Sequence, residues 1–306
     1  MKKKLIIPLI ITLTVFAVGV WYYLRNRNSG EEIVDLTAYE QDPAAKKEMD
    51  ARILNYPESG SNSLFKILTN QFYEGYDVET YKGVFPIYED SASLFTADKR
   101  AGNLAIAKQM IAKYDTLVQE ASSIHRVPRI LIYGIMLAEH ERSVSLTQAE
   151  SYSRPGSQYI GLMQISATTA KDSLSRNIKY KQLSPAQVNL FTKKGIIKGS
   201  GSTATVSVSS SQLRKVDINI HAGAEYLSRH INSWGIYQPE KIAVSYNQGE
   251  GALRRDKLTR STPDLIYQFY KRQTSGQIVQ VKGYLLKILG KHGACDILFN
   301  DLGIND

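Results

Sequence analysis

The chain has 306 residues, which is enough to bury one sizeable core together with flanking segments. It contains a single cysteine, Cys295, so an internal disulfide and a cysteine-based metal site are excluded, and a buried, inert thiol is expected there. The formal net charge of +9 favours an anionic neighbour, either a membrane surface or a polymer. The sequence has no zinc-finger spacing and no dense lysine and arginine block, and so we predict no nucleic-acid partner.

The first clear pattern is an uncharged stretch from Leu5 to Leu24 that follows three lysines. About twenty residues suffice for a helix that crosses a bilayer, so we expect a transmembrane anchor over 5–24. The positive charges place residues 1–4 in the cytosol and the rest of the chain outside the membrane, on the periplasmic or wall side. A cleavable signal peptide is the alternative, but the aromatic end at Trp21–Tyr23 favours an uncleaved anchor.

Residues 25–100 mix glycine, serine, asparagine, proline and acidic residues with short apolar stretches. We interpret them as a juxtamembrane spacer or a small helical region. From Leu104 to about residue 123, apolar residues recur at helical spacing and predict an amphipathic helix. Val127-Pro128 then ends this helix and can begin the next one.

The second predicted helix, about 128–140, carries a carboxylate at the end of its apolar stripe. Ile132, Ile135, Met136 and Glu139 stand at i, i+3, i+4 and i+7, so Glu139 faces the protein body or a groove in it. Burial there would raise the carboxyl pKa above its ordinary value of about 4.3, as a general acid near neutral pH requires. A structural ion pair would place a glutamate in the same way, and its position alone leaves both interpretations open.

The pattern beyond Gln164 is mainly helical. The spacing predicts helices over 167–177, 217–234, from Pro239 into Tyr246-Asn247, 263–272 and 278–289. Gly223 permits close packing of one of these helices on a neighbour. Residues 192–213 form an insertion rich in glycine, serine and threonine, in which 203–208 alternate like a strand. A hairpin, a flap and a plain loop all fit this insertion.

Four motifs follow one another in a recognisable order. They are Val127-Pro128 through Glu139-His140, Gly161-Leu162-Met163-Gln164-Ile165, Asn219-Ile220 through Tyr226-Leu227, and Ser245-Tyr246-Asn247-Gln248-Gly249. In this order they resemble the soluble lytic transglycosylase catalytic domain, to which goose-type lysozyme is related. The resemblance covers roughly 104–255, about half of the chain. It implies a mainly α, lysozyme-like catalytic domain over 101–260 with a small β/loop insertion, followed by a C-terminal helical extension over 261–306.

The resemblance also implies a chemistry. Glu139 would cleave the bond between N-acetylmuramic acid and N-acetylglucosamine in peptidoglycan as a single catalytic glutamate, leaving a 1,6-anhydromuramic acid end. No cofactor and no metal are implied, and the partners would be glycan strands and the membrane. The implied substrate-binding residues are His140, Gly161, Leu162, Met163, Gln164, Tyr226, Tyr246 and Asn247.

The chain departs from the family pattern at several of these positions. His140 stands where the family has serine, and Gln248 stands where alanine is usual. Gln158-Tyr159-Ile160 replaces the common Gly-Ala-x before the second motif. These departures concern contacts to the sugar more than the reaction.

Two other glutamates compete with Glu139 for the catalytic role. Glu150-Ser151 spells the family's Glu-Ser, but it follows a polar stretch and precedes a turn, without an apolar helix to shield it. Glu141 would point to nearly the opposite face of the helix from Glu139. His140-Glu141 begins like a zinc-protease motif, but Val144 occupies the position of the second ligand, so no zinc site is expected.

Two alternative functions stay open at this stage. A hydrolytic muramidase of the goose-lysozyme type would use the same site, with water as the attacking group. A non-catalytic wall-binding component of an envelope-spanning apparatus would keep the fold and the groove. The retained acid at position 139 favours an enzyme, since a binding module has little need of a desolvated carboxylate.

Overall fold

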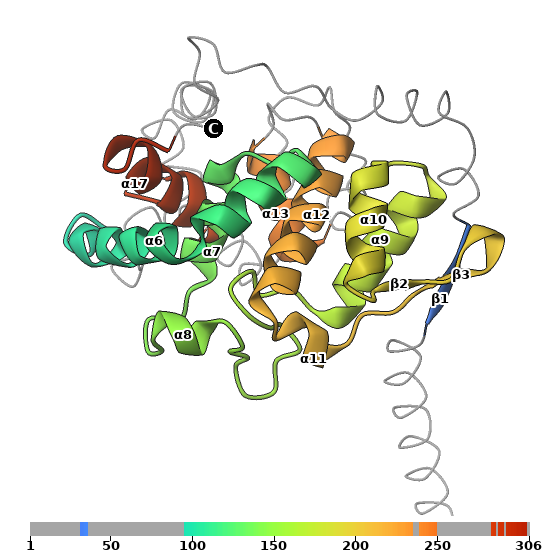
Figure 1. The fold of residues 1–306 in the computed structure, drawn as a ribbon. Coiled ribbons are helices and arrows are strands. Elements are labelled where there is room, and N and C mark those ends of the chain that lie inside the picture. The colour runs from blue at the N-terminus through green and yellow to red at the C-terminus, as the bar shows by residue number, and fades with distance from the viewer. Residues whose placement is uncertain are drawn as a thin grey trace, which may run out of the picture.

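The computed structural model describes residues 31–35, 95–234, 239–249, 283–285, 287–290 and 292–304. These residues form a mainly helical body with one small sheet at its edge (Figure 1). The predicted anchor 5–24, the predicted helix 263–272 and most of the spacer lie outside the described residues. Among the helices that are described, none combines the length and apolar character that a membrane span needs.

Two consecutive helices confirm the first two predicted ones. α6 spans Arg100–His125 and α7 spans Arg129–Glu139. Between them Arg126 adopts a left-handed conformation with φ 53°, and the Val127 N–H donates to the Ser122 carbonyl at 3.2 Å. Pro128 is the N-cap of α7, a place where its missing N–H breaks no helical hydrogen bond. The turn predicted at Val127-Pro128 is therefore confirmed.

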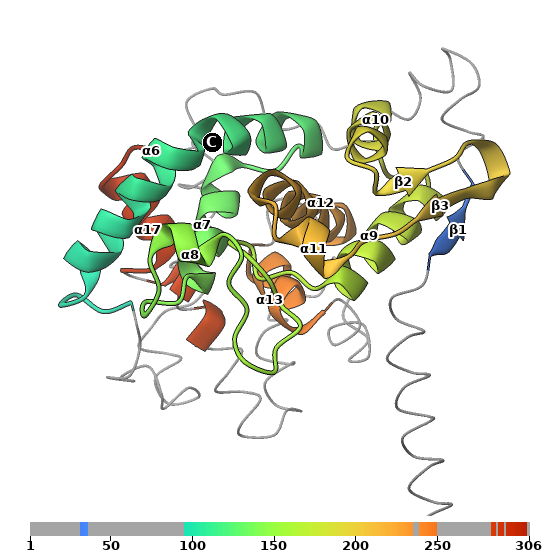
Figure 2. The ribbon, with the colours of Figure 1, turned by 60° about the horizontal axis from the view of Figure 1, so that its bottom comes forward.

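α7 is a central helix, because every residue from Ile130 to Ala138 is buried. The predicted apolar stripe of Ile132, Ile135 and Met136 is buried, and the other faces of the helix are buried as well. The other faces are covered partly by the C-terminal segment, which comprises helical residues at 283–285 and 287–289 and helix α17, Ala294–Asn300. Gly134 allows this close approach, since a Cβ there would lie 3.0 Å from the Cys295 sulfur and 3.9 Å from Ile288. Figures 1 and 2 both show α17 beside α6 and α7.

The next helices begin at serine caps. They are α8 (Leu146–Ala149), α9 (Ala167–Lys179), α10 (Pro185–Lys193) and α11 (Ser210–Leu213). The prediction for 167–177 is confirmed by α9, whereas α10 was missed. Its signal is nevertheless present in the sequence, because Ser184 and Gln187 form a capping box and Pro185 follows the cap.

The insertion at 192–213 contains a hairpin, which decides among the three possibilities. β2 (Ile197–Lys198) pairs antiparallel with β3 (Ala204–Val206), and a short 3-10 helix over Gly201–Thr203 lies between them. β3 is shorter than the strand expected over 203–208. A third strand was not expected: β1 (Glu32–Val34), from the predicted spacer, pairs antiparallel with β3. The sheet order is β1-β3-β2.

α12 (Val216–Trp234) and α13 (Pro239–Gln248) confirm the last two predicted helices that are fully described. α12 packs against α6, α9 and α13, so it runs through the middle of the body (Figure 2). A Cβ on Gly223 would lie 2.6 Å from the Met163 side chain. The predicted close packing at Gly223 is confirmed, and its partner belongs to the second sequence motif.

Candidate active site

Glu139 is the last residue of α7 and retains partial solvent exposure. The chain turns to an extended conformation at His140, so the helix ends at Glu139. Burial raises the pKa of Glu139, while the Tyr284 hydroxyl, Lys287 and Arg154 act to lower it. The net result is a pKa above the ordinary value. The carboxyl can therefore hold a proton closer to neutral pH while part of the residue still reaches solvent.

Tyr284 and Lys287 come from the C-terminal segment and were not among the predicted site residues. Tyr284 is 5% exposed, and burial followed by the Glu139 charge raises its pKa, so it stays a neutral donor beside the carboxyl. Its hydroxyl does not form a hydrogen bond of standard geometry with any described residue. Burial lowers the pKa of Lys287, and the Glu139 charge opposes that shift. Their i, i+3 spacing, one helical turn, is the only signal that the sequence offers.

The second motif forms a tight turn between Ile160 and Ile165. These two residues exchange backbone hydrogen bonds, each 3.2 Å long. Gly161 has φ +76°, where a glycine is favoured, and Gln164 also lies in the left-handed region with φ 43°. The Gln164 amide nitrogen donates to the carbonyls of Gly161 (2.7 Å) and Tyr152 (3.2 Å). These bonds offset the cost of the left-handed conformation at Gln164.

Two side chains from other helices hold this turn in place. Asn219 of α12 is fully buried; it accepts from the Met163 N–H at 2.9 Å and donates to the carbonyls of Ile160 (2.9 Å) and Leu213 (3.1 Å). Tyr246 of α13 donates from its hydroxyl to the Met163 carbonyl at 2.8 Å. The second, third and fourth motifs therefore meet at one turn. The bracing role of Asn219 was missed, although the residue belongs to a recognised motif.

A pocket of about 220 Å³ lies beside the turn. Its described lining residues are Tyr159, Gln164, Ile165, Thr169, Tyr226, Tyr246, Asn247, Gln248 and Gly249. Four of the predicted substrate-binding residues, at 164, 226, 246 and 247, thus share one wall. The Tyr226 and Tyr246 rings lie 5.3 Å apart. Burial raises the pKa of Tyr246, and the charge of Glu139 raises it further. Glu139 is not among the described lining residues, but its charge reaches this tyrosine of the pocket wall.

The other predicted substrate-binding residues are placed differently. Leu162 and Met163 are 3% and 0% exposed and pack inside the core, and Gly161 lies against Asn219. His140 is 7% exposed, and burial lowers its pKa to about 4. Its Nδ1 atom is buried and lacks a hydrogen-bond partner among the described residues. Substrate contacts by these four residues stay predictions.

The two competing glutamates have partners of their own. Glu150 accepts from the Tyr114 hydroxyl at 2.8 Å and pairs with Lys113 at 2.7 Å. Burial acts to raise the pKa of Glu150, but these two partners hold it below its ordinary value. Glu141 pairs with Arg154 at 2.9 Å. The lowered pKa of Glu150 disfavours a protonated acid near neutral pH, in contrast to Glu139.

The part of the chain that the structure describes contains no cluster of metal-ligating side chains. No three histidine, cysteine, aspartate or glutamate side chains come together there as a metal ion would require. The chemistry that the described arrangement supports is proton transfer by the Glu139 carboxyl, whose charge reaches Tyr246 in a pocket wall of tyrosine and amide side chains.

Comparison with known proteins links this geometry to a family. The family described as the transglycosylase SLT domain matches residues 116–268, half of the chain. The matched range contains Glu139, the turn at 161–164 and all the described pocket residues, whereas Tyr284 and Lys287 lie beyond it. No curated protein and no solved structure matches the chain.

Proposed function

We propose that this chain, which belongs to the transglycosylase SLT domain family, cleaves peptidoglycan with Glu139 as its catalytic acid. Membership of the family indicates a peptidoglycan-degrading function of the lytic transglycosylase type. The observation that carries the assignment to Glu139 is its place at the end of the buried helix α7, with a raised pKa and with a charge that reaches Tyr246, a residue of the pocket wall. A carboxyl with these two properties is suited to protonate a leaving group bound beside it.

In the first step, Glu139 donates its proton to the oxygen that bridges N-acetylmuramic acid and N-acetylglucosamine. The bond from the muramoyl C1 to that oxygen breaks, and the glucosamine unit leaves with a hydroxyl. The muramoyl N-acetyl group stabilises the positive charge that develops at C1. On the pocket wall, the Gln164 amide oxygen supplies an acceptor and the Asn247 amide nitrogen a donor for an acetamido sugar, since the Gln164 nitrogen already donates to two carbonyls.

In the second step, Glu139 is a carboxylate and acts as the base. It takes the proton of the muramoyl C6 hydroxyl, whose oxygen forms the bond to C1 and closes the 1,6-anhydro ring. The acid is regenerated, and no water is consumed. Between the two steps, the neutral hydroxyl of Tyr284 and the positive charge of Lys287 favour the charged form of Glu139.

A single carboxyl suffices for this sequence of steps. Most glycosidases place two carboxyls on either side of the bond, about 5 to 9.5 Å apart, one of them acting as nucleophile or activating water. The two competing glutamates, Glu141 and Glu150, are engaged with Arg154 and Lys113. They are therefore poorly suited to serve as that second group, which supports the one-glutamate proposal.

The test is mass spectrometry of the muropeptides that the full chain releases from purified peptidoglycan. Wild-type protein should release products that end in 1,6-anhydromuramic acid. Glu139→Gln removes the proton but preserves the shape of the side chain, so it should release none while still binding the wall. Glu150→Gln is the matched control, because it makes the same change at a partly buried, paired carboxyl that competed with Glu139 for the catalytic role, and it should remain active.

Each other result would overturn part of the proposal. Ends that are heavier by one water would mean that water attacks C1 and that the protein is a muramidase. Wall binding without release by the wild type would indicate a non-catalytic wall-binding component. Equal release by Glu139→Gln and wild type would refute Glu139 as the acid.

We also propose that residues 5–24 anchor the protein in the cell membrane, with the catalytic domain outside. The uncharged length of this segment and the lysines that precede it support the proposal. The protein should sediment with membranes and stay there after a high-salt wash, and added protease should digest the part beyond residue 25 from outside. Release by salt, or a mature chain that lacks the first residues, would contradict an uncleaved anchor.

A further inference from the structure

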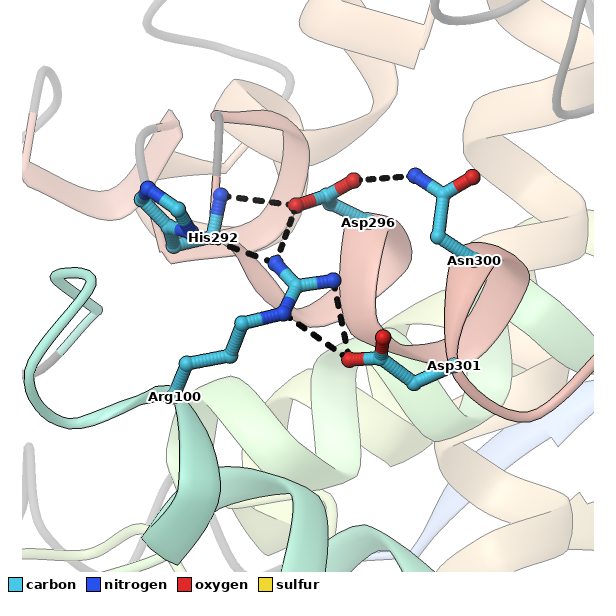
Figure 3. Close-up of polar contacts among 5 residues, drawn as sticks. All are labelled: Arg100, His292, Asp296, Asn300 and Asp301. Carbon is cyan, nitrogen blue, oxygen red and sulfur yellow. Dashed lines mark hydrogen bonds and ion pairs between the residues drawn. The ribbon is translucent and has the colours of Figure 1, made fainter.

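The first residue of α6, Arg100, binds the C-terminal end of the described chain. Its guanidinium donates to Asp296 at 2.5 Å and, through Nε, to Asp301 at 2.9 Å, and a second nitrogen lies 2.8 Å from the same Asp301 oxygen. A contact of 3.2 Å joins it to the His292 ring. Figure 3 shows the guanidinium enclosed by these three side chains.

A second set of bonds orders the acceptors. Asp296 accepts from the His292 backbone N–H at 2.8 Å and from the Asn300 amide at 2.5 Å, as Figure 3 also shows. Burial opposes ionisation of Asp296, but Arg100 and these donors hold its pKa below the ordinary value. We call this set of five residues, Arg100, His292, Asp296, Asn300 and Asp301, the Arg100 clasp. Asp296 is thus charged at neutral pH and held in position.

The Arg100 clasp differs from an ordinary surface ion pair. Exposed pairs contribute little because solvent screens them and both side chains lose freedom. Here the side chains of Arg100, Asp296 and Asp301 are only 23%, 12% and 27% exposed. One planar guanidinium joins two carboxylates, a geometry that a lysine cannot reproduce.

The Arg100 clasp lies at the far end of the segment that supplies Tyr284 and Lys287. Residues 287–290 and 292–304 are separated by one position, and both parts pack on α7, where Ile288 and Cys295 meet Gly134. α17 itself has seven residues, too few for a helix to be stable alone. Its place on α6 and α7 therefore depends on contacts such as those of the clasp.

We propose that Arg100 is a positioning residue of the active site, which holds α17 against α6 and α7 and thereby keeps Tyr284 and Lys287 at Glu139. This inference rests on the proposed function of Glu139. It makes the C-terminal segment a working part of the site, although the family match ends before it.

The only cysteine of the chain reports directly on the Arg100 clasp. Cys295 precedes Asp296 in α17 and is 1% exposed, and burial raises its thiol pKa to about 12. It should react with a small aromatic disulfide reagent only when α17 leaves α7. Arg100→Gln should speed this reaction roughly tenfold to hundredfold, the factor that corresponds to one lost hydrogen bond to a charged group. Arg100→Lys should fall between this variant and wild type.

Lys113→Gln is the matched control. Lys113 lies on the same helix as Arg100, and the substitution breaks its pair with Glu150 without touching the C-terminal segment. The reaction of Cys295 should therefore keep the wild-type rate. All variants are compared at a temperature at which circular dichroism shows each to be folded. An Arg100→Gln rate equal to that of wild type would refute the clasp.

Kinetics on a soluble glycan oligomer test the positioning role. Arg100→Gln should lower kcat with little change in KM, because the pocket wall comes from α12, α13 and the 159–169 region rather than from the C-terminal segment. Faster thiol reaction with unchanged kcat would overturn the positioning role and leave a purely structural clasp. An inactive wild type would instead overturn the proposed function, and the thiol rates would still report on the clasp.

Discussion

Replacing Asn219 with alanine should both destabilise the protein and reduce its activity. Asn219 is fully buried and makes three hydrogen bonds, to the Met163 N–H and to the carbonyls of Ile160 and Leu213. Alanine removes all three bonds and leaves the three backbone groups without these partners. The turn that carries Gln164 would then depend mainly on Tyr246 for its attachment to the helices.

The magnitude follows from the number of bonds. Each buried hydrogen bond contributes about 1 kcal/mol net, so the free energy of unfolding should fall by about 3 kcal/mol. Water that enters the space could bond to some of the stranded groups and reduce this loss. A domain of this kind has a stability of roughly 5 to 15 kcal/mol, so the variant should still fold at room temperature.

Urea denaturation followed by circular dichroism measures the stability, and muropeptide release measures the activity. Gln119→Ala is the control, because the Gln119 amide makes one exposed hydrogen bond, to Asp115, and should change stability by less than about 0.5 kcal/mol. Activity of Asn219→Ala should fall at temperatures at which the variant is fully folded. A stability loss below about 1 kcal/mol with full activity would refute the bracing role.

Three further variants test the packing and the buried charges. Gly223→Ala should lower the free energy of unfolding by about 1 to 3 kcal/mol in urea, because its Cβ meets Met163; an unchanged midpoint would contradict this contact. His125 and His221 bond to each other in the core, and burial lowers both pKa values, so the unfolded chain binds protons more readily. Below about pH 6.5 these histidines take up protons in the unfolded chain but not in the folded one, so the free energy of unfolding falls. His125→Gln should therefore show a smaller fall than wild type between about pH 7.5 and 5, and an equal fall in both proteins would contradict this origin. The pH dependence that Glu225 contributes has the opposite sign. Burial raises the pKa of Glu225 to about 7, so stability is lost as pH rises through that value. Glu225→Gln should gain up to about 3 kcal/mol over wild type near pH 8 and lose the gain near pH 5, and a gain independent of pH would argue against this origin.

The helices that could be predicted are those whose signals are local. Apolar spacing located α6, α9 and α12 to within a few residues, and the left-handed Arg126 with Pro128 separates α6 from α7 as the sequence indicated. α10 was missed even though its serine cap and proline are equally local. For α7, periodicity located the helix but not its environment. A stripe describes one covered face, whereas here the C-terminal segment packs on a second one.

The amino-acid sequence by itself determined the order of the motifs, the positions of most helices and the choice of Glu139 as the candidate acid, because these depend on neighbouring residues along the chain. Only the tertiary structure decided what surrounds that acid. Tyr284, Lys287 and the clasp residue Arg100 are far from Glu139 in sequence, and strand β1 pairs with a hairpin more than 160 residues away. No local pattern encodes such contacts, since they form only when the packed core brings distant segments together.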